Sequence, residues 1–216
     1  EVENVWGVYY AVATVNGVGY TTVTKAINAA ANGATVQLLA GTISEVIKPW
    51  AADSQHTSEK SITIVGAENF GTTLTGGLYL GYDDSGFREH TITINGIAFE
   101  GKGILVAGQQ NVVIEGNKFT NITELVATSQ SANANAISVI GKNVNATVKN
   151  NIISGVNVAG INLRDVANAT VEGNTITDTK HNAITITETA GDGEISVVNN
   201  KLSQWGLGEQ NGRAIR

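Results

Sequence analysis

Apolar and polar residues alternate in short runs that return along the second half of the chain. The run "NVVIEGNKF" starts at Asn111, and similar runs start at Asn145, Asn168 and Glu194. Alternation with a period of two predicts β-strands with one buried face, and the Gly or Asn after each run predicts a turn. Aligned, the runs share three columns: Asn117, Asn151, Asn174 and Asn200; Ile114, Val148, Val171 and Val197; and Phe119, Ile153, Ile176 and Leu202.

A second short apolar segment accompanies each run. Its inward positions are Ile104, Ile137, Ile161, Ile184 and Ile215, with Val106, Val139, Leu163 and Ile186 two residues later. Members of the Asn column are 34, 23 and 26 residues apart, so a fixed scaffold carries loops of variable length. Such spacing is typical of a solenoid, whose turns bury their apolar faces by stacking on neighbours. The pattern predicts an all-β fold, a single-stranded right-handed parallel β-helix of about seven coils over residues 34–216.

The Asn column has a structural explanation in this fold. Equivalent residues of successive coils are expected to lie one strand spacing apart, about 4.8 Å. An unpaired buried amide costs about 1 to 3 kcal/mol, but stacked amides can hydrogen-bond to one another. Asn also tolerates the left-handed backbone of a sharp bend. We therefore assign these residues to the architecture. Asn145 and Asn168 also stand in Asn-Ala-Thr sequons, which we attribute to the Asn- and Thr-rich composition.

Residues 1–33 are expected to form a hairpin and a short capping helix in front of the solenoid. The hairpin turns at Asn16 and Gly17. The helix begins after a Thr and ends before Gly33, and its apolar face comprises Val23, Ala26, Ile27 and Ala30. It is expected to lie across the strand of the first coil, within Ala34–Thr42.

At the other end, the residues "GRAIR" begin a coil, because Ile215 falls in the inward column, and then the sequence stops. We expect an uncapped end there. Either the chain is part of a longer protein, which the missing initiator Met favours, or another subunit supplies the next coil. An open parallel edge also permits end-to-end self-association.

The run from Val12 to Glu45, "VATVNGVGYTTVTKAINAAANGATVQLLAGTISE", resembles the entry module of β-helix domains in large secreted or cell-wall-anchored proteins of gut bacteria. Together with the repeats, it makes nearly the whole chain similar to the pectate-lyase-like β-helix superfamily. The resemblance implies a parallel β-helix in an extracellular, cell-surface protein. Enzymes of that superfamily typically carry a cluster of acidic calcium ligands near a catalytic Arg or Lys, and this chain matches that pattern only thinly, at Asp165, Glu188 and Arg164.

The composition limits the classes of partner that the chain is expected to bind. The net charge is −6 and the 13 Lys and Arg are scattered, which argues against nucleic acid and anionic membranes. No apolar run reaches the length of a membrane span. The absence of Cys excludes disulfide and thiolate chemistry.

One outward column is the candidate for chemistry. It comprises Tyr79, Leu105, Ser138, Asn162 and Thr185, flanked three residues later by Tyr82, Gly108, Gly141, Asp165 and Glu188. Asp165 and Glu188 are expected to be neighbours beside Arg164, and retaining glycosidases hold two carboxylates about 5 to 5.5 Å apart. The alternative is a solvent-exposed pair of acids whose charge is partly neutralised by Arg164 or Lys142.

Aromatic and polar residues suggest a binding surface as well. Exposed rings are common platforms for sugars or partner proteins. The candidate ligand-binding residues are Tyr79, Tyr82, Asn162, Trp50 and Trp205; alternatively, the two Trp close the ends of coils. His181, in a turn with Asp178 and Lys180, is expected to be part of a polar loop; the alternative is an acid or base for catalysis.

We expect no cofactor. Calcium is the one ion for which the insertion Gly81–His90, with Asp83 and Asp84, offers oxygen ligands. We expect a non-catalytic module that binds a glycan or a host or cell-surface ligand, or spaces other domains. The alternatives are a polysaccharide lyase or glycosidase that uses Asp165 and Glu188, and a self-assembling subunit.

Overall fold

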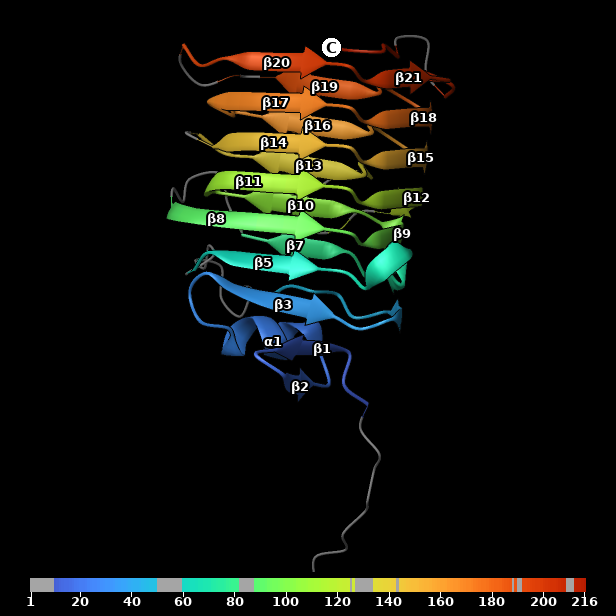
Figure 1. Ribbon diagram of the computed structural model, residues 1–216. Coiled ribbons are helices and arrows are strands. Elements are labelled where there is room, and N and C mark those ends of the chain that lie inside the picture. The colour runs from blue at the N-terminus through green and yellow to red at the C-terminus, as the bar shows by residue number, and fades with distance from the viewer. Residues whose placement is uncertain are drawn as a thin grey trace, which may run out of the picture.

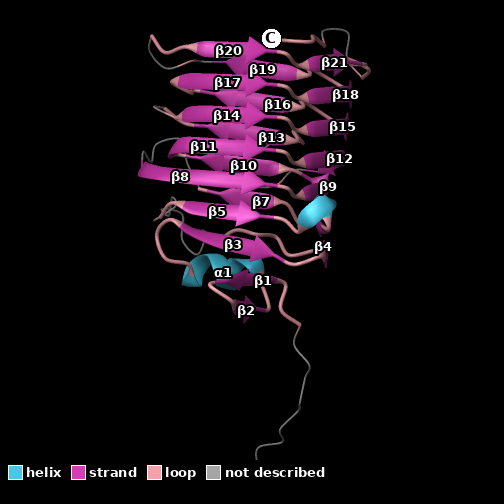
Figure 2. Ribbon diagram, in the orientation of Figure 1, coloured by secondary structure: helices cyan, strands magenta, loops and turns pink. Residues whose placement is uncertain are grey.

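Three parallel β-sheets wrap around one apolar core in the computed structural model, which describes residues 10–49, 60–81, 88–124, 126, 134–142, 144–187, 189, 192–208 and 212–216. The strands stack coil upon coil from β3 to β20, and the N-terminal hairpin and helix α1 lie at one end of the stack (Figure 1). Strands dominate, and helix within these residues is confined to two short segments (Figure 2). The predicted all-β parallel β-helix is confirmed.

The strands fall into sheets that we name A, B and C. Sheet A contains β1 (Ala13–Val15), β2 (Val18–Tyr20), β3 (Ala34–Leu38), β5 (Ile62–Val65), β8 (Arg88–Asn95), β11 (Gln109–Glu115), β14 (Asn145–Lys149), β17 (Asn168–Glu172) and β20 (Ile195–Val198). Sheet B contains β4 (Gly41–Ile43), β6 (Thr72–Leu74), β9 (Ala98–Lys102), β12 (Lys118–Glu124), β15 (Ile152–Val156), β18 (Thr175–Thr179) and β21 (Lys201–Ser203). Sheet C contains β7 (Leu78–Leu80), β10 (Ile104–Ala107), β13 (Ile137–Ile140), β16 (Ile161–Arg164) and β19 (Ile184–Thr187).

The register of the strands confirms the columns expected from the sequence. Ile114, Val148, Val171 and Val197 pair in sheet A, and Phe119, Ile153, Ile176 and Leu202 pair in sheet B. Ile104, Ile137, Ile161 and Ile184 pair in sheet C, and Ile215 bridges to Ile184. The coil count of about seven stays a prediction, because several connections between strands lie outside the described residues.

The core is continuous along the stack because each inward column is apolar. The rings of Phe99 and Phe119, on successive coils of sheet B, are stacked with centroids 4.8 Å apart and an interplanar angle of 8°. Both side chains are buried. The spacing between neighbouring strands is close to the separation of two stacked aromatic rings. Parallel in-register pairing therefore lets aromatic residues of successive coils stack in one column.

Left-handed backbone turns the chain at matching places in successive coils. Directly after strands of sheet A, positive φ is found at Gly96, Gly116, Asn150, Gly173 and Asn199, and the longer connection from β5 to β6 adds Asn69 and Phe70. Within the strands of sheet B such residues are Gly101, Asn121, Gly155 and Asp178, and Gln204 directly follows β21. After the strands of sheet C they are Gly81, Gly108, Gly141 and Asp165. Gly, Asn and Asp adopt this conformation at the lowest cost, so backbone geometry explains most of these residue types.

The N-terminal elements match the prediction. Strands β1 and β2 form a hairpin whose turn residues Asn16 and Gly17 have φ of 50° and 80°, as a type I′ turn requires. Strand β1 also pairs antiparallel with β3, so the hairpin extends sheet A over the first coil. The capping helix, α1 (Val23–Ala29), begins after Thr22, which accepts a hydrogen bond from the Lys25 backbone N–H.

Two charged side chains from the first coils hold α1 at its ends. The Glu45 carboxylate accepts hydrogen bonds from the backbone N–H groups of Val23 and Thr24 at 2.6 and 3.0 Å. The Lys60 ammonium donates to the carbonyl groups of Ile27, Asn28 and Ala30 at 3.2, 3.0 and 2.6 Å. An anion at the helix N-terminus and a cation at its C-terminus both favour the helix dipole, so these contacts fix the cap on the solenoid.

Candidate functional site

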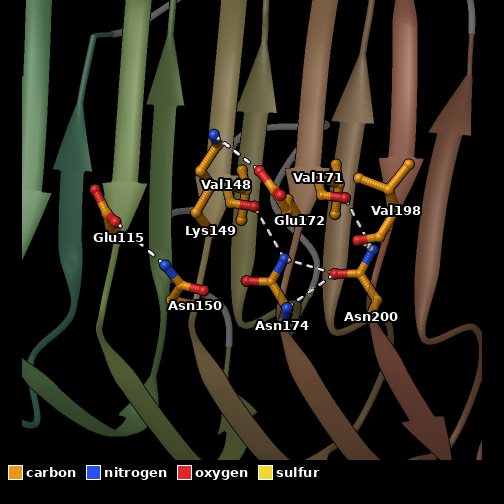
Figure 3. Close-up of polar contacts among 9 residues, drawn as sticks. All are labelled: Glu115, Val148, Lys149, Asn150, Val171, Glu172, Asn174, Val198 and Asn200. Carbon is orange, nitrogen blue, oxygen red and sulfur yellow. Dashed lines mark hydrogen bonds and ion pairs between the residues drawn. The ribbon is translucent and has the colours of Figure 1, made fainter.

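The Asn column forms a largely buried hydrogen-bonded ladder between sheets A and B. Figure 3 shows its last two members, Asn174 and Asn200. Asn174 Oδ1 accepts from the backbone N–H and the side-chain amide of Asn151 at 3.0 and 2.9 Å. Asn174 in turn donates to Asn200 Oδ1 through its backbone N–H and its Nδ2, both at 2.9 Å. Asn117 makes the same pair of contacts to Asn151. The predicted architectural role of these residues is therefore confirmed.

The outward column of sheet C has the predicted register but not the expected exposure. Tyr79 pairs with Leu105, and Leu105 pairs with Ser138. All three are nearly inaccessible, with Tyr79 only 3% exposed. The prediction that Tyr79 is an exposed platform is wrong, because its ring packs in a second apolar cluster with Leu105, Val126 and Ile140. Lys48 adds a cation–π contact, its Nζ lying 5.2 Å from the ring centroid of Tyr79.

The predicted catalytic group is only partly described. Arg164 Nε lies 3.5 Å from Asp165 Oδ2, and both side chains are partly exposed. Asp165 has a φ of 58° and follows its strand as Gly108 and Gly141 follow theirs, so the corner itself favours Asp there. Its backbone N–H donates to the Thr187 carbonyl at 3.1 Å, but Glu188 lies outside the described residues. The carboxylate pair therefore stays a hypothesis.

The other predicted ligand-binding residues are scattered. Asn162 is half-buried on sheet C beside Thr185, and Trp205 is 40% exposed after β21. Trp50 and Tyr82, with the aspartates of the Gly81–His90 insertion, lie outside the described residues. Within the described residues, no three His, Asp or Glu side chains are grouped to hold a metal ion.

Sheet A carries an outward pattern that the sequence reasoning missed. Its central row pairs strand by strand through Thr35, Thr63, Thr93, Val113, Thr147, Thr170 and Ser196. Every one of these side chains is at least partly exposed. Six of the seven carry a hydroxyl group, so this face presents one hydroxyl per coil with a single Val in the series. We call it the threonine row.

A row of amides and hydroxyls runs beside the threonine row. Asn168 Nδ2 donates to Asn145 Oδ1 at 2.7 Å, and Asn145 Nδ2 donates to Asn111 Oδ1 at 3.2 Å. Asn111 Nδ2 reaches Thr91 Oγ1 at 3.4 Å, and the Thr91 N–H donates to Ser61 Oγ at 3.0 Å. The repeated Asn-Ala-Thr phrase was the available signal, since its Asn and Thr project from one face of a strand. These residues form an outer ladder, which we call the asparagine row.

A charged row borders the threonine row on the side of the buried Asn ladder. Glu115, Lys149 and Glu172 pair across successive strands, and Lys149 Nζ lies 2.9 Å from Glu172 Oε2 (Figure 3). Asn150 Nδ2 donates to Glu115 Oε1 at 3.3 Å. Lys149 is paired with Glu172, and Glu115 accepts from an amide, so this row is engaged in contacts of its own.

Comparison with known proteins agrees with this architecture. The model of a protein family described as "Right handed beta helix region" matches residues 58–211. No curated protein and no solved structure matches the chain. No helix among the described residues is long and apolar enough to cross a membrane. With most of its length covered by the family's pattern and its strands wound into three parallel sheets, this chain belongs to the right-handed β-helix family.

Proposed function

We propose that this chain is a non-catalytic, carbohydrate-binding β-helix module of an extracellular, cell-surface protein, and that it binds a neutral polysaccharide along sheet A. The observation that carries the proposal is the pair of uncharged rows, which present hydroxyl and amide groups on successive coils without interruption by a charge from Ser61 to Asn168.

The chemistry of the two rows suits sugar hydroxyl groups. A Thr hydroxyl both donates and accepts hydrogen bonds, and an Asn amide offers two donors and an acceptor. Sugar hydroxyls have the same dual character, so each can find a partner whichever way it is oriented. Because neither row carries a basic side chain along this stretch, it offers no ion pairs to acidic glycans or phosphates.

The spacing suits a polymer more than a single sugar. Equivalent side chains recur about every 4.8 Å along the solenoid axis. A polysaccharide lying along this axis meets a new pair of outward residues at each coil, from Ser61 and Thr63 to Asn168 and Thr170, with Val113 as an apolar member. Many weak contacts on one rigid face add by multivalency. The stacked core and the buried Asn ladder keep the face rigid, which lowers the ordering cost of binding.

Retention on insoluble polysaccharides tests this function. The full chain is expected to bind one of microcrystalline cellulose, chitin or insoluble xylan. The double substitution Thr147→Lys and Thr170→Lys, on paired positions of the threonine row, is expected to weaken retention at least about tenfold, because it removes two hydroxyls and places charge on the row.

The matched control places the same two charges on sheet B, at Ser154→Lys and Thr177→Lys, which also pair across neighbouring strands. This variant is expected to bind like the parent chain. Equal loss in both variants, or no retention of the parent chain on any of the three polymers, contradicts the proposal. The second result leaves the structural spacer role.

A further inference from the structure

A cleft of about 700 Å³ opens at the corner between sheets A and B in the first coils. Gln37, Val65 and Asn95 form one wall, and these residues continue the charged row of sheet A toward the N-terminus. The other wall is the short 3₁₀ segment η1 (Glu68–Phe70), which precedes β6. The floor contains three corner glycines, Gly66, Gly96 and Gly116.

Two of the floor glycines lie at a left-handed corner that also accepts Asn. Gly96 and Gly116 have φ of 69° and 63°, but Asn150 and Asn199 occupy the same corner position with φ of 54° and 57°. A Cβ atom on Gly96 would lie 4.0 Å from its nearest neighbour, and one on Gly116 would lie 3.6 Å from Asn95 Oδ1. An Asn side chain at either position would therefore have room and would fill part of the cleft, whereas Gly leaves that space open.

Gly66 differs from the other two. A Cβ atom there would lie 2.3 Å from the carbonyl oxygen of Gly96, a backbone atom that cannot move aside cheaply. This glycine is explained by close packing of successive coils. The contrast separates one architectural glycine from two whose effect is to leave space beside the walls.

The η1 wall contains an aromatic residue, Phe70, whose backbone conformation is unusual. Asn69 and Phe70 have φ of 56° and 57°, and for a bulky side chain this left-handed backbone is a true outlier. Buried Thr72 supports the turn: its Oγ1 accepts from the Ala67 N–H at 2.9 Å and donates to the Leu39 carbonyl at 2.9 Å. The turn therefore presents Phe70, partly exposed, at the cleft.

The opposite wall is fixed as well. Gln37 Nε2 donates to the carbonyl groups of Leu38, Val65 and Gly66 at 3.0, 3.2 and 3.0 Å. A ligand in the cleft thus meets one aromatic ring, several amide groups and one carboxylate, that of Glu68. A ring that packs against the apolar face of a ligand, with amides around it for hydroxyl groups, suits a neutral sugar. The single negative charge disfavours anions.

We infer that this cleft is a binding subsite for one neutral pyranose ring, packed on Phe70 and contacted by Asn95 and Asn69. The site lies at a corner of the coil, and its existence does not depend on polysaccharide binding by the threonine row. A soluble sugar fills it alone, whereas the polymer assay reports the face of sheet A.

Ligand-observed saturation-transfer NMR on the full chain tests the inference with the methyl glycosides of glucose, galactose and N-acetylglucosamine, and with galacturonate as the anionic probe. At least one neutral glycoside is expected to receive saturation, and galacturonate is not. The double variant Gly96→Asn and Gly116→Asn fills the floor with side chains that the same corner already accepts elsewhere, and is expected to reduce affinity at least about tenfold. The control Asn150→Gly changes the equivalent corner outside the cleft and is expected to leave affinity unchanged.

Amide chemical-shift mapping of the unmodified chain makes the test independent of how the variants fold. Shifts are expected at Gly66–Phe70 and at Asn95 and Gly96. The inference is overturned if none of the neutral glycosides receives saturation, if shifts occur only elsewhere, or if binding persists in the Gly96→Asn and Gly116→Asn variant. Binding confined to galacturonate overturns the assigned ligand class.

Discussion

Truncation of one rung of the buried ladder has a cost that the hydrogen bonds of Asn174 allow us to work out. Asn174→Ala removes two hydrogen bonds donated by Nδ2, to Val148 O and Asn200 Oδ1, and two accepted by Oδ1 from Asn151. Asn174 and Asn151 are both fully buried, so water cannot replace these partners. The backbone N–H of Asn151 and the carbonyl group of Val148 each lose the partner named above, at about 1 to 3 kcal/mol each. We therefore expect the free energy of unfolding to fall by about 3 kcal/mol.

Asn200→Ala is the matched control, because Asn200 makes the same kinds of contact at the end of the ladder. Its side chain donates to Val171 O and Val198 O and accepts from the backbone N–H and Nδ2 of Asn174. Asn200 itself is partly exposed, so its truncation opens the end of the ladder to solvent. Water can therefore satisfy the groups that truncation frees, and we expect a loss of only about 1 kcal/mol. Position along the ladder, and not the residue type, sets the difference.

Two measurements check this pair. Urea unfolding followed by circular dichroism gives the loss of stability, and hydrogen exchange gives the local effect at the Asn151 amide. That amide is expected to be protected in the parent chain and in Asn200→Ala, and to exchange much faster in Asn174→Ala. Equal losses in the two variants within about 0.5 kcal/mol, or an Asn151 amide that stays equally protected, would refute the reasoning.

Three further variants probe other contacts. Glu45→Gln is expected to lower the free energy of unfolding by about 1 kcal/mol in urea titrations, because the negative charge at the helix N-terminus is lost. An unchanged midpoint would show that this charge does not stabilise the helix. Phe119→Ala is expected to cost about 4 kcal/mol, since it deletes a buried ring stacked on Phe99, and a loss below about 2 kcal/mol would count against tight stacking. Gly66→Ala is expected to cost about 3 kcal/mol by thermal melting, whereas Gly96→Asn costs less than about 1 kcal/mol; the reverse order would contradict the assignment of the floor glycines.

The inward half of this fold could be predicted from sequence because burial imposes a strict pattern. The column that includes Ile137 and Ile161 faces the core in successive coils. The column that includes Asn151 recurs because each buried amide hydrogen-bonds to the next. Alignment of the repeats therefore predicted the register. The hairpin at Asn16 and the helix before Gly33 followed from turn and capping residues with few alternatives.

The outward half could not be predicted in the same way. Tyr79 is outward by register, but its exposure depends on Val126, which comes from a loop with no periodicity. The repeated Asn-Ala-Thr segment contained part of the threonine row, but Thr is also a common residue on the outer face of strands. Its meaning depends on a series across the sheet, interrupted at Val113, that only the full set of strand pairings reveals. The conformation of Phe70 goes against the preference of its residue type, and no sequence rule indicates it.

The stacking of successive coils underlies every surface described above, and distances between pairs of spin labels test it most directly. The chain has no Cys, so labels can be placed at Thr35 together with Thr147, Thr170 or Ser196 without background. These positions of the threonine row lie four, five and six strands from Thr35. Pulsed electron resonance is expected to give mean separations near about 19, 24 and 29 Å, rising by one strand spacing per coil. Separations that fail to rise in equal steps would contradict the stacked register and the sites built on it.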